Sequence, residues 1–169
     1  MNTSTVHTVH PSPLGDLLLT GAVSPDGLTL TSLGMPGQRG APAVRPQDRD
    51  DAPFAEAHRQ LDAYFAGRGT RFTLPLAATG TPFQRAVWRA VEDIPYGTTA
   101  TYGELAARLG VPRAELRAVG RVLGANPLLL VRPCHRVIGA DGTMRGYAGG
   151  VERKRWLLTH EGALQPALM

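Results

Sequence analysis

Residues 101–124 read TYGELAARLGVPRAELRAVGRVLG, and this stretch decides how the second half of the chain folds. Apolar residues recur at helical spacing on both sides of a break at Gly110 and Pro112. Glycine commonly ends a helix, and proline is favoured at the start of the next one. The stretch therefore predicts two short helices, over residues 101–109 and 113–124, joined by a tight turn. This arrangement is typical of a helix-turn-helix.

The second of these helices carries Arg113, Arg117 and Arg121, which recur every four residues along one side. A basic face on the second helix fits binding to nucleic acid. A solvated arginine face on an ordinary helical hairpin fits equally well, because arginine is a good helix former on any surface. The two helices alone leave both interpretations open.

Charge is distributed unevenly along the chain. Residues 1–79 hold six arginines and seven acidic residues, whereas residues 80–169 hold twelve basic and seven acidic residues. The net charge of +4 therefore comes from the second half, which suggests a polyanionic partner, nucleic acid first. The 17 arginines against one lysine also fit a compositional bias, so the charge alone does not decide the partner.

Downstream of the two helices, residues 131–138 read VRPCHRVI and contain the only cysteine of the 169 residues. Pro133 has no backbone N–H, so Cys134 is expected on a turn or at the end of an element. Cationic neighbours at Arg132 and Arg136 are expected to favour the thiolate over the thiol. The alternative is a buried cysteine that acts as a small hydrophobic residue. A single cysteine forms no internal disulfide, which fits a reducing, cytoplasmic compartment.

Around this centre the sequence predicts an α+β protein of two domains. The C-terminal domain, residues 80–169, is mainly helical and contains the helix-turn-helix and the cysteine. Thr81 and Pro82 predict its first helix, which should end near Ile94, and its last helix spans residues 151–159. The N-terminal domain, residues 1–79, is predicted as a small antiparallel sheet with one helix. The predicted parts of this domain are strands at 4–10, 14–20 and 28–33, a loop at 34–51, a helix at 53–66, and a last strand with a linker at 68–79.

Several classes of function are not supported by the sequence. No apolar run approaches the roughly 20 residues of a membrane helix, and the N-terminus does not resemble a secretion signal. Residues 1–79 contain no cysteine, and we expect no metal site and no cofactor. His58 lies on the apolar face of the predicted helix and is interpreted as a core histidine whose ring nitrogens are hydrogen-bonded.

A series of motifs in the second half, in this order, closely resembles the O6-alkylguanine-DNA alkyltransferases, also called methylated-DNA–protein-cysteine methyltransferases. The resemblance covers about residues 80–162, and residues 1–79 fit the variable N-terminal domain of that family only loosely. The motifs are Thr81-Pro82-Phe83-Gln84, Val87-Trp88, Ile94-Pro95-Tyr96-Gly97, Tyr102, Arg117-Ala118-Val119-Gly120, Asn126-Pro127, Pro133-Cys134-His135-Arg136-Val137-Ile138, Trp156-Leu157-Leu158 and His160-Glu161-Gly162.

The resemblance implies a monomeric, cytoplasmic repair protein that acts once. It would bind duplex DNA through the minor groove, flip an O6-alkylguanine out of the stack, and move the alkyl group irreversibly onto its own cysteine. No cofactor is implied. Activity on O4-methylthymine and the accepted size of the alkyl group stay open.

The resemblance also assigns roles to single residues. Cys134 would be the nucleophile and acceptor, His135 would take its proton through a water, and Glu161 would orient the imidazole. The expected substrate and DNA contacts are Tyr102 on the flipped base, Arg117 in the vacated stack, Asn126 between the helices and the cysteine, and Arg113, Arg121, Arg136, Tyr147 and Ala148. The chain departs from the family at Ala148, where a serine often follows the tyrosine.

Three other functions compete with this interpretation. A non-catalytic protein of the alkyltransferase-like kind binds alkyl lesions without repairing them, but such proteins lack the acceptor cysteine. A helix-turn-helix regulator would not need Cys134, His135 and Glu161. A cysteine hydrolase would turn over repeatedly and would not need the basic helix.

Overall fold

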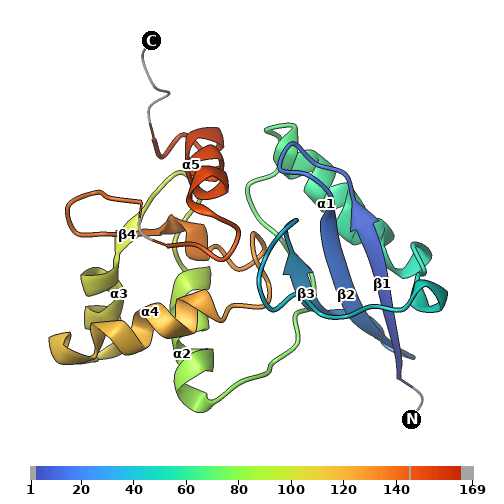
Figure 1. Cartoon of the computed structure of the whole chain (residues 1–169), viewed down its shortest axis with the longest axis horizontal. Coiled ribbons are helices and arrows are strands. Elements are labelled where there is room, and N and C mark those ends of the chain that lie inside the picture. The colour runs from blue at the N-terminus through green and yellow to red at the C-terminus, as the bar shows by residue number, and fades with distance from the viewer. Residues whose placement is uncertain (1–2, 145, 165–169) are drawn as a thin grey trace. The chain divides into compact units, whose positions relative to one another are not determined.

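The computed structural model describes residues 3–144 and 146–164. The chain forms two compact units, which separate between Ala77 and Ala78. Within the described residues, the first unit holds a three-stranded sheet and one α-helix, and the second holds four α-helices and a two-stranded sheet (Figure 1). The α+β class and the predominance of helix in the second half agree with the sequence.

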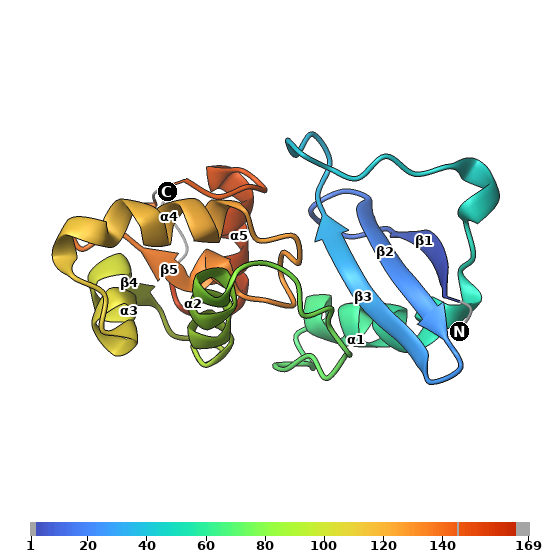
Figure 2. The ribbon, with the colours of Figure 1, turned by 90° about the horizontal axis from the view of Figure 1, so that it is seen from below.

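The sheet of the first unit is antiparallel, in the order β1 (Ser4–His10), β2 (Leu17–Ser24) and β3 (Gly27–Gly34). Leu19 of β2 pairs with Thr8 of β1 and with Leu33 of β3, so these side chains share one face. Helix α1 (Ala55–Phe65) follows a 3-10 turn, η2 (Ala52–Phe54), and runs along the sheet (Figure 2). The core of this unit contains Leu17, Leu19, Leu30, Leu33, Phe54, Ala57, Leu61 and Tyr64.

Two predictions for the first unit need correction. The strand expected within residues 68–79 is absent, and only Leu76 forms an isolated parallel bridge with Leu30 of β3. The segment 34–51 is not free of regular structure, because it contains a 3-10 turn, η1 (Pro46–Asp48), and Arg49 forms a bridge with His7 of β1. Short pairings of this kind have no hydrophobic period that a sequence could reveal.

The second unit begins with α2 (Pro82–Glu92), as the Thr81-Pro82 pair predicted. The Thr81 hydroxyl accepts from the Gln84 backbone N–H, and the Gln84 side chain accepts from the Thr81 N–H, which completes a capping box. Trp88 is buried within this unit, and its indole Nε1 donates to the Val122 carbonyl at 3.0 Å. This bond ties α2 to the second helix of the helix-turn-helix.

The predicted pair of short helices is present. Helix α3 (Tyr102–Leu109) ends at Gly110, which has a φ of 67°, a value that glycine adopts without a steric penalty. The expected second helix is split into a 3-10 turn, η3 (Arg113–Glu115), and α4 (Leu116–Gly124). Helix α4 buries Val119, Val122 and Leu123 and leaves its arginine side exposed.

A two-stranded parallel sheet joins the helix-turn-helix to the cysteine segment. Its strands are β4 (Ala100–Thr101), directly before α3, and β5 (Val137–Ile138), directly after a 3-10 turn, η4 (Cys134–Arg136). Helix α5 (Val151–His160) closes the unit. Strands β4 and β5 were not predicted, since two-residue strands lie below any recognisable period.

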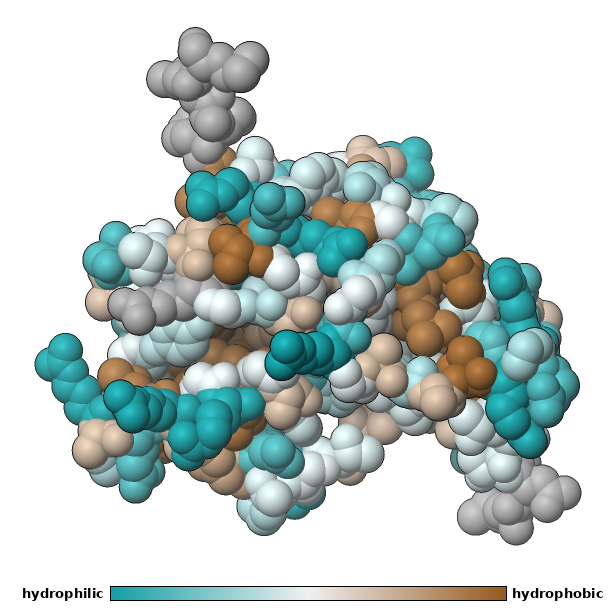
Figure 3. Space-filling view, viewed as in Figure 1, coloured by the Kyte–Doolittle hydropathy of each residue, from teal (hydrophilic) through white to brown (hydrophobic). Residues whose placement is uncertain are grey.

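The face in Figure 3 shows mixed hydrophilic and weakly polar areas, interrupted by smaller hydrophobic ones. Among the described residues, the exposed large hydrophobic side chains are Val44 and Val151. In this part of the chain no helix combines the length and apolar character needed to cross a membrane.

Candidate active site

The only cysteine begins the turn η4, where the preceding proline predicted a turn. Cys134 is buried, with 6% of its surface exposed. The turn leads directly into β5, which pairs with β4 at Ala100–Val137. The segment that carries the cysteine is therefore joined through this pairing to the strand that leads into the helix-turn-helix.

The side chain of Asn126 organises the loop that leads to the cysteine. Its Nδ2 donates to the Arg132 carbonyl at 3.1 Å and contacts Cys134 Sγ at 3.2 Å, while its Oδ1 accepts from the Leu128 N–H at 3.0 Å. The loop is tightly folded, with Leu130 at a φ of 71°. The role expected for Asn126 was structural, and the structure adds a direct contact with the sulfur.

His135 and Glu161 form the second part of the site. The Nε2 of His135 lies 2.8 Å from Oε2 of Glu161, and neither side chain has any exposed surface. An ionised carboxylate only accepts hydrogen bonds, so Nε2 carries the hydrogen and Nδ1 carries the lone pair. Among the described residues, Nδ1 of His135 has no hydrogen-bond partner, although it is buried. The imidazole can therefore accept a proton at Nδ1.

Arg136 also binds Glu161. Its Nε donates to Oε1 at 2.8 Å and its Nη2 to Oε2 at 3.1 Å, while its Nη1 donates to the Ile94 carbonyl at 2.7 Å. Burial opposes the charge on Glu161, but the hydrogen bonds from His135 and Arg136 outweigh it and lower the pKa of Glu161 to about 2. Arg136 was expected to contact DNA, but in this structure its side chain is buried and its three nitrogens donate to Glu161 and to the Ile94 carbonyl.

Burial of the cysteine acts against the thiolate, in contrast to the influence expected from its sequence neighbours. Burial raises the pKa of Cys134, against the opposing influence of the Asn126 hydrogen bond and of the Lys154 and Arg132 charges. Arg132 is paired with Glu92 at 3.2 Å and lies over the Trp88 ring at 4.7 Å. Arg132 and Arg136 each bind a carboxylate, and the remaining influence of the Arg132 charge on the sulfur does not offset burial.

Lys154 is a further charged residue of the site, and it was not predicted. This single lysine of the chain is almost wholly buried in α5, and its Nζ donates to the Val137 carbonyl at 2.6 Å. Burial lowers its pKa to about 8, and the charge of Cys134 acts in the opposite direction. The sequence held one indication of this residue, a single lysine in a chain with 17 arginines, but this ratio also fits a compositional bias.

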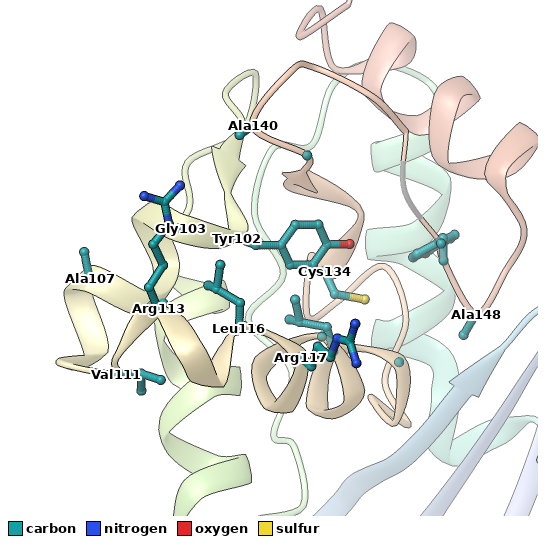
Figure 4. Close-up of a pocket in the computed structure, with 17 residues that line it drawn as sticks. Tyr102, Gly103, Ala107, Val111, Arg113, Leu116, Arg117, Cys134, Ala140 and Ala148 are labelled. Carbon is teal, nitrogen blue, oxygen red and sulfur yellow. The ribbon is translucent and has the colours of Figure 1, made fainter.

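A pocket of about 1000 Å³ opens in front of the cysteine. Predicted site residues that line it are Tyr102, Arg113, Arg117, Cys134, Tyr147 and Ala148. In Figure 4, Tyr102 and Arg117 point toward the part of the pocket where Cys134 lies, and Arg113 points away from it. Much of the remaining wall is glycine and alanine, so the backbone is accessible to a ligand.

The other predicted residues lie outside the lining. Asn126, His135 and Glu161 stand behind the cysteine, and Arg121 is exposed on α4. Tyr147 lines the pocket with its ring edge-to-face to His135, and its buried hydroxyl has no hydrogen-bond partner among the described residues. Burial raises the pKa of Tyr147 well above its ordinary value. Within the described residues no group of three or more potential ligands could hold a metal ion.

Comparisons with known proteins agree over nearly the whole chain. A family model described as "6-O-methylguanine DNA methyltransferase, DNA binding domain" matches residues 82–163, and one described as "6-O-methylguanine DNA methyltransferase, ribonuclease-like domain" matches residues 5–78. A methylated-DNA–protein-cysteine methyltransferase from Methanosarcina acetivorans is 43% identical over 157 residues, which cover 93% of this chain and 98% of the relative. The chain belongs to this methyltransferase family.

Another methylated-DNA–protein-cysteine methyltransferase, from Mycobacterium tuberculosis, is 47% identical over 156 residues and covers 92% of both chains. The crystal structure of the M. tuberculosis protein OGT in complex with DNA superposes with a TM-score of 0.82. That match has 43% sequence identity and covers 93% of this methyltransferase and 92% of the other chain. Family membership therefore rests on the fold as well as on the sequence.

Proposed function

We propose that the protein repairs DNA by transferring an alkyl group from O6-alkylguanine in duplex DNA to its own Cys134. The observation that carries this proposal is the sulfur itself. It lies at the wall of a pocket that is also lined by the helix-turn-helix, and a hydrogen-bond donor and a histidine–carboxylate pair stand behind it. The similarity to a methyltransferase solved with DNA supports the same partner.

In the proposed reaction the sulfur attacks the alkyl carbon, an S–C bond forms and the C–O6 bond of guanine breaks. A thiolate suits this reaction because it is the strongest nucleophile among the side chains. The thiol proton passes to Nδ1 of His135, through a water between the two groups. Glu161 accepts the hydrogen bond from Nε2 and stabilises the imidazolium that forms, the role that an orienting carboxylate has in a catalytic triad.

Two further groups assist the proposed transfer. The amide of Asn126 donates to the sulfur at 3.2 Å and stabilises the developing thiolate, for which burial is otherwise unfavourable. The hydroxyl of Tyr102 lies in the pocket and would donate a hydrogen bond to the flipped base, so that guanine leaves as a neutral molecule. The resulting thioether is stable, so each molecule acts once.

DNA binding is assigned to residues 80–169 and residues 1–79 are assigned a structural role, in a monomer. The exposed Arg113 and Arg121 would lie along phosphates, and the exposed Arg117 would fill the space left by the extruded nucleotide. Flipping requires a few kcal/mol and is least unfavourable for a weakly paired damaged base, which favours the lesion over intact guanine. The cytoplasm is the proposed location, because a catalytic thiol needs reducing conditions.

Intact-protein mass spectrometry tests the proposal. The protein is incubated with an excess of a duplex that contains one O6-methylguanine. We expect each molecule to gain one methyl group, located on Cys134 by peptide mapping, and the reaction to stop at one equivalent. The Cys134→Ala variant should bind the same duplex and gain no mass. Binding without any mass gain in the natural protein would support a non-catalytic lesion-binding protein instead, and repeated turnover would support a hydrolase.

A further inference from the structure

One carboxylate in this site is shared by two consecutive residues. Glu161 caps the C-terminus of α5, while His135 and Arg136 both belong to the turn η4. Oxygen Oε2 receives His135 Nε2 at 2.8 Å and Arg136 Nη2 at 3.1 Å, and Oε1 receives Arg136 Nε at 2.8 Å. The two-point contact from the guanidinium fixes the plane of the carboxylate as well as its position.

Arg136 is itself held firmly. Its third nitrogen donates to the Ile94 carbonyl at 2.7 Å, and its guanidinium carbon lies 5.7 Å from the centre of the Tyr96 ring. The side chain is only 9% exposed. Removing such a group from its carboxylate is unfavourable, because it leaves a buried charge without a partner. Arg136 therefore cannot serve as a DNA contact and remain bound to Glu161.

The charges around His135 explain what the arrangement does. Arg136 and Glu161 neutralise each other, so a neutral imidazole leaves this buried group without net charge. The other groups that face His135 are Cys134 on its own turn, Lys154 on α5 and Tyr147 on the glycine-rich loop. Burial, Arg136 and Lys154 lower the pKa of His135, and only Glu161 raises it. Without Arg136 the carboxylate would be left to pair with a protonated imidazole.

We propose that Arg136 is a positioning residue for alkyl transfer, which holds Glu161 against Nε2 of His135 and keeps the imidazole neutral, with its lone pair on Nδ1. A protonated imidazole cannot accept the thiol proton, so this arrangement keeps the base in its working form before the lesion arrives. The inference rests on the proposed function of the site. It assigns to Arg136 a role in proton transfer in place of a role in DNA binding.

The test measures the rate of methyl transfer as a function of pH for the natural protein and for the variants Arg136→Lys and Arg136→Met. Arg136→Met should raise the pH at which activity appears. The rate near neutral pH should then fall about tenfold for each pH unit by which the profile moves, and it should recover at higher pH. Arg136→Lys keeps a charge but loses the two-point contact with Glu161. The midpoint of its pH profile should lie between those of the natural protein and Arg136→Met.

Arg132→Lys is the matched control, because Arg132 also flanks the cysteine and is buried, but it binds Glu92 and not Glu161. This variant should leave the midpoint of the pH profile in place. All variants should retain their affinity for duplex DNA and its dependence on salt, whereas Arg113→Ala should lower both. Loss of DNA affinity in Arg136→Lys would restore the DNA-binding role and overturn the inference.

Nitrogen NMR of the imidazole gives a readout that does not depend on activity. At neutral pH the natural protein should show a neutral His135 with hydrogen on Nε2, and Arg136→Lys should show a larger protonated fraction. If Arg136→Met fails to fold, the spectra of the natural protein and of Arg136→Lys still decide the question. An unchanged imidazole together with a rate lowered equally at every pH would overturn the inference. Absence of transfer in the natural protein would instead overturn the proposed function, and the spectra would still test the positioning role.

Discussion

The chain contains two buried histidine clusters, and the difference between them shows what separates an active site from a core. In the first unit, Nδ1 of His10 lies 2.7 Å from Nδ1 of His58, and Nε2 of His58 lies 3.2 Å from the Thr8 hydroxyl. Nε2 of His10 lies 3.1 Å from Asp62, outside hydrogen-bonding geometry, and the Asp62 side chain is 71% exposed. In the second unit, the carboxylate bound to His135 has no exposed surface.

Burial of a histidine is therefore common to both clusters and does not mark function. The second cluster adds a buried carboxylate that two residues share, a nucleophile on the residue next to the imidazole, and a pocket. The first cluster has no thiol, because the chain has one cysteine, and solvent screens its acid. A buried acid that must be ionised makes the second cluster sensitive to any change in its partners.

The largest expected effect comes from removing the acid of each cluster. Glu161→Gln should slow methyl transfer about 100-fold or more, the range for loss of a general base, because the amide no longer stabilises an imidazolium. It should also lower the free energy of unfolding by about 3–5 kcal/mol, since Arg136 becomes a buried unpaired charge. Single-turnover kinetics and chemical denaturation measure the two effects.

The matched change in the first unit is Asp62→Asn. It should leave the rate of methyl transfer unchanged and change the free energy of unfolding very little. Acid denaturation separates the two further. The pKa of Glu161 is lowered to about 2, so its contribution to stability is present above the unfolded pKa of about 4.5 and is lost as the pH falls toward 2. Equal effects of the two substitutions on the rate of methyl transfer would contradict the distinction between an active-site cluster and a core cluster.

The sequence predicted the parts of the fold that have a period or a cap. The helix after Thr81 begins where this N-cap residue stands, and α3 begins one residue later than predicted, at Tyr102, and ends at Gly110. The sheet of β1, β2 and β3 followed from alternating apolar residues between turns, although β2 begins three residues later than predicted, at Leu17. The β4–β5 pair was missed because it contains two residues per strand and joins segments 37 positions apart, at Ala100 and Val137.

For the candidate site, the sequence predicted which residues belong to it better than it predicted their burial and their charged partners. Cys134, Tyr102 and Arg117 do line one pocket. The sequence could not show which arginines face solvent. Arg132 binds Glu92 and Arg136 binds Glu161, and these acids lie 40 and 25 positions away in the sequence. Sequence flanks of the cysteine suggested a lowered thiol pKa, whereas three-dimensional burial raises it.

The next largest effect is expected at Asn126. Its amide contacts the Cys134 thiol, and a thiol is the group that the first histidine cluster lacks. Asn126→Ala removes the contact with the sulfur and leaves the Leu128 N–H and the Arg132 carbonyl without this partner. We expect a loss of stability of about 2–4 kcal/mol, as for buried groups left unsatisfied, together with a higher thiol pKa. Alkylation by iodoacetamide across pH measures the thiol, and a thiol that titrates as in the natural protein would remove the amide from the mechanism.

A smaller effect is expected at Lys154, whose positive charge lowers the pKa of the Cys134 thiol. Lys154→Met should slow transfer about tenfold, because a thiol without this charge has a higher pKa. The folded pKa of Lys154 is about 8 and the ordinary value is 10.5, so between these values the unfolded chain binds more protons and stability of the natural protein rises with pH. Denaturation at pH 7 and pH 10 should show that the stability of the natural protein rises relative to that of the variant, because groups such as Cys134 and Tyr147 titrate in both proteins. Parallel changes in the two proteins would mean that folding does not lower the pKa of Lys154.

The smallest effect concerns the first cluster alone. Burial and the neighbouring His58 lower the pKa of His10, while Asp62 acts in the opposite direction. A histidine with a lowered pKa stabilises the fold above its unfolded value of about 6.5, and this contribution is lost as the pH falls below it. The protection factors of the β1 and α1 amides, which compare the measured exchange with the intrinsic exchange at the same pH, should therefore fall between pH 7 and pH 5. His58→Gln should reduce this fall, because the neighbour that helps to lower the pKa of His10 is gone. Transfer activity at neutral pH should be the same in both proteins, and a slower His58→Gln variant would mean that the first cluster contributes to the chemistry of the second.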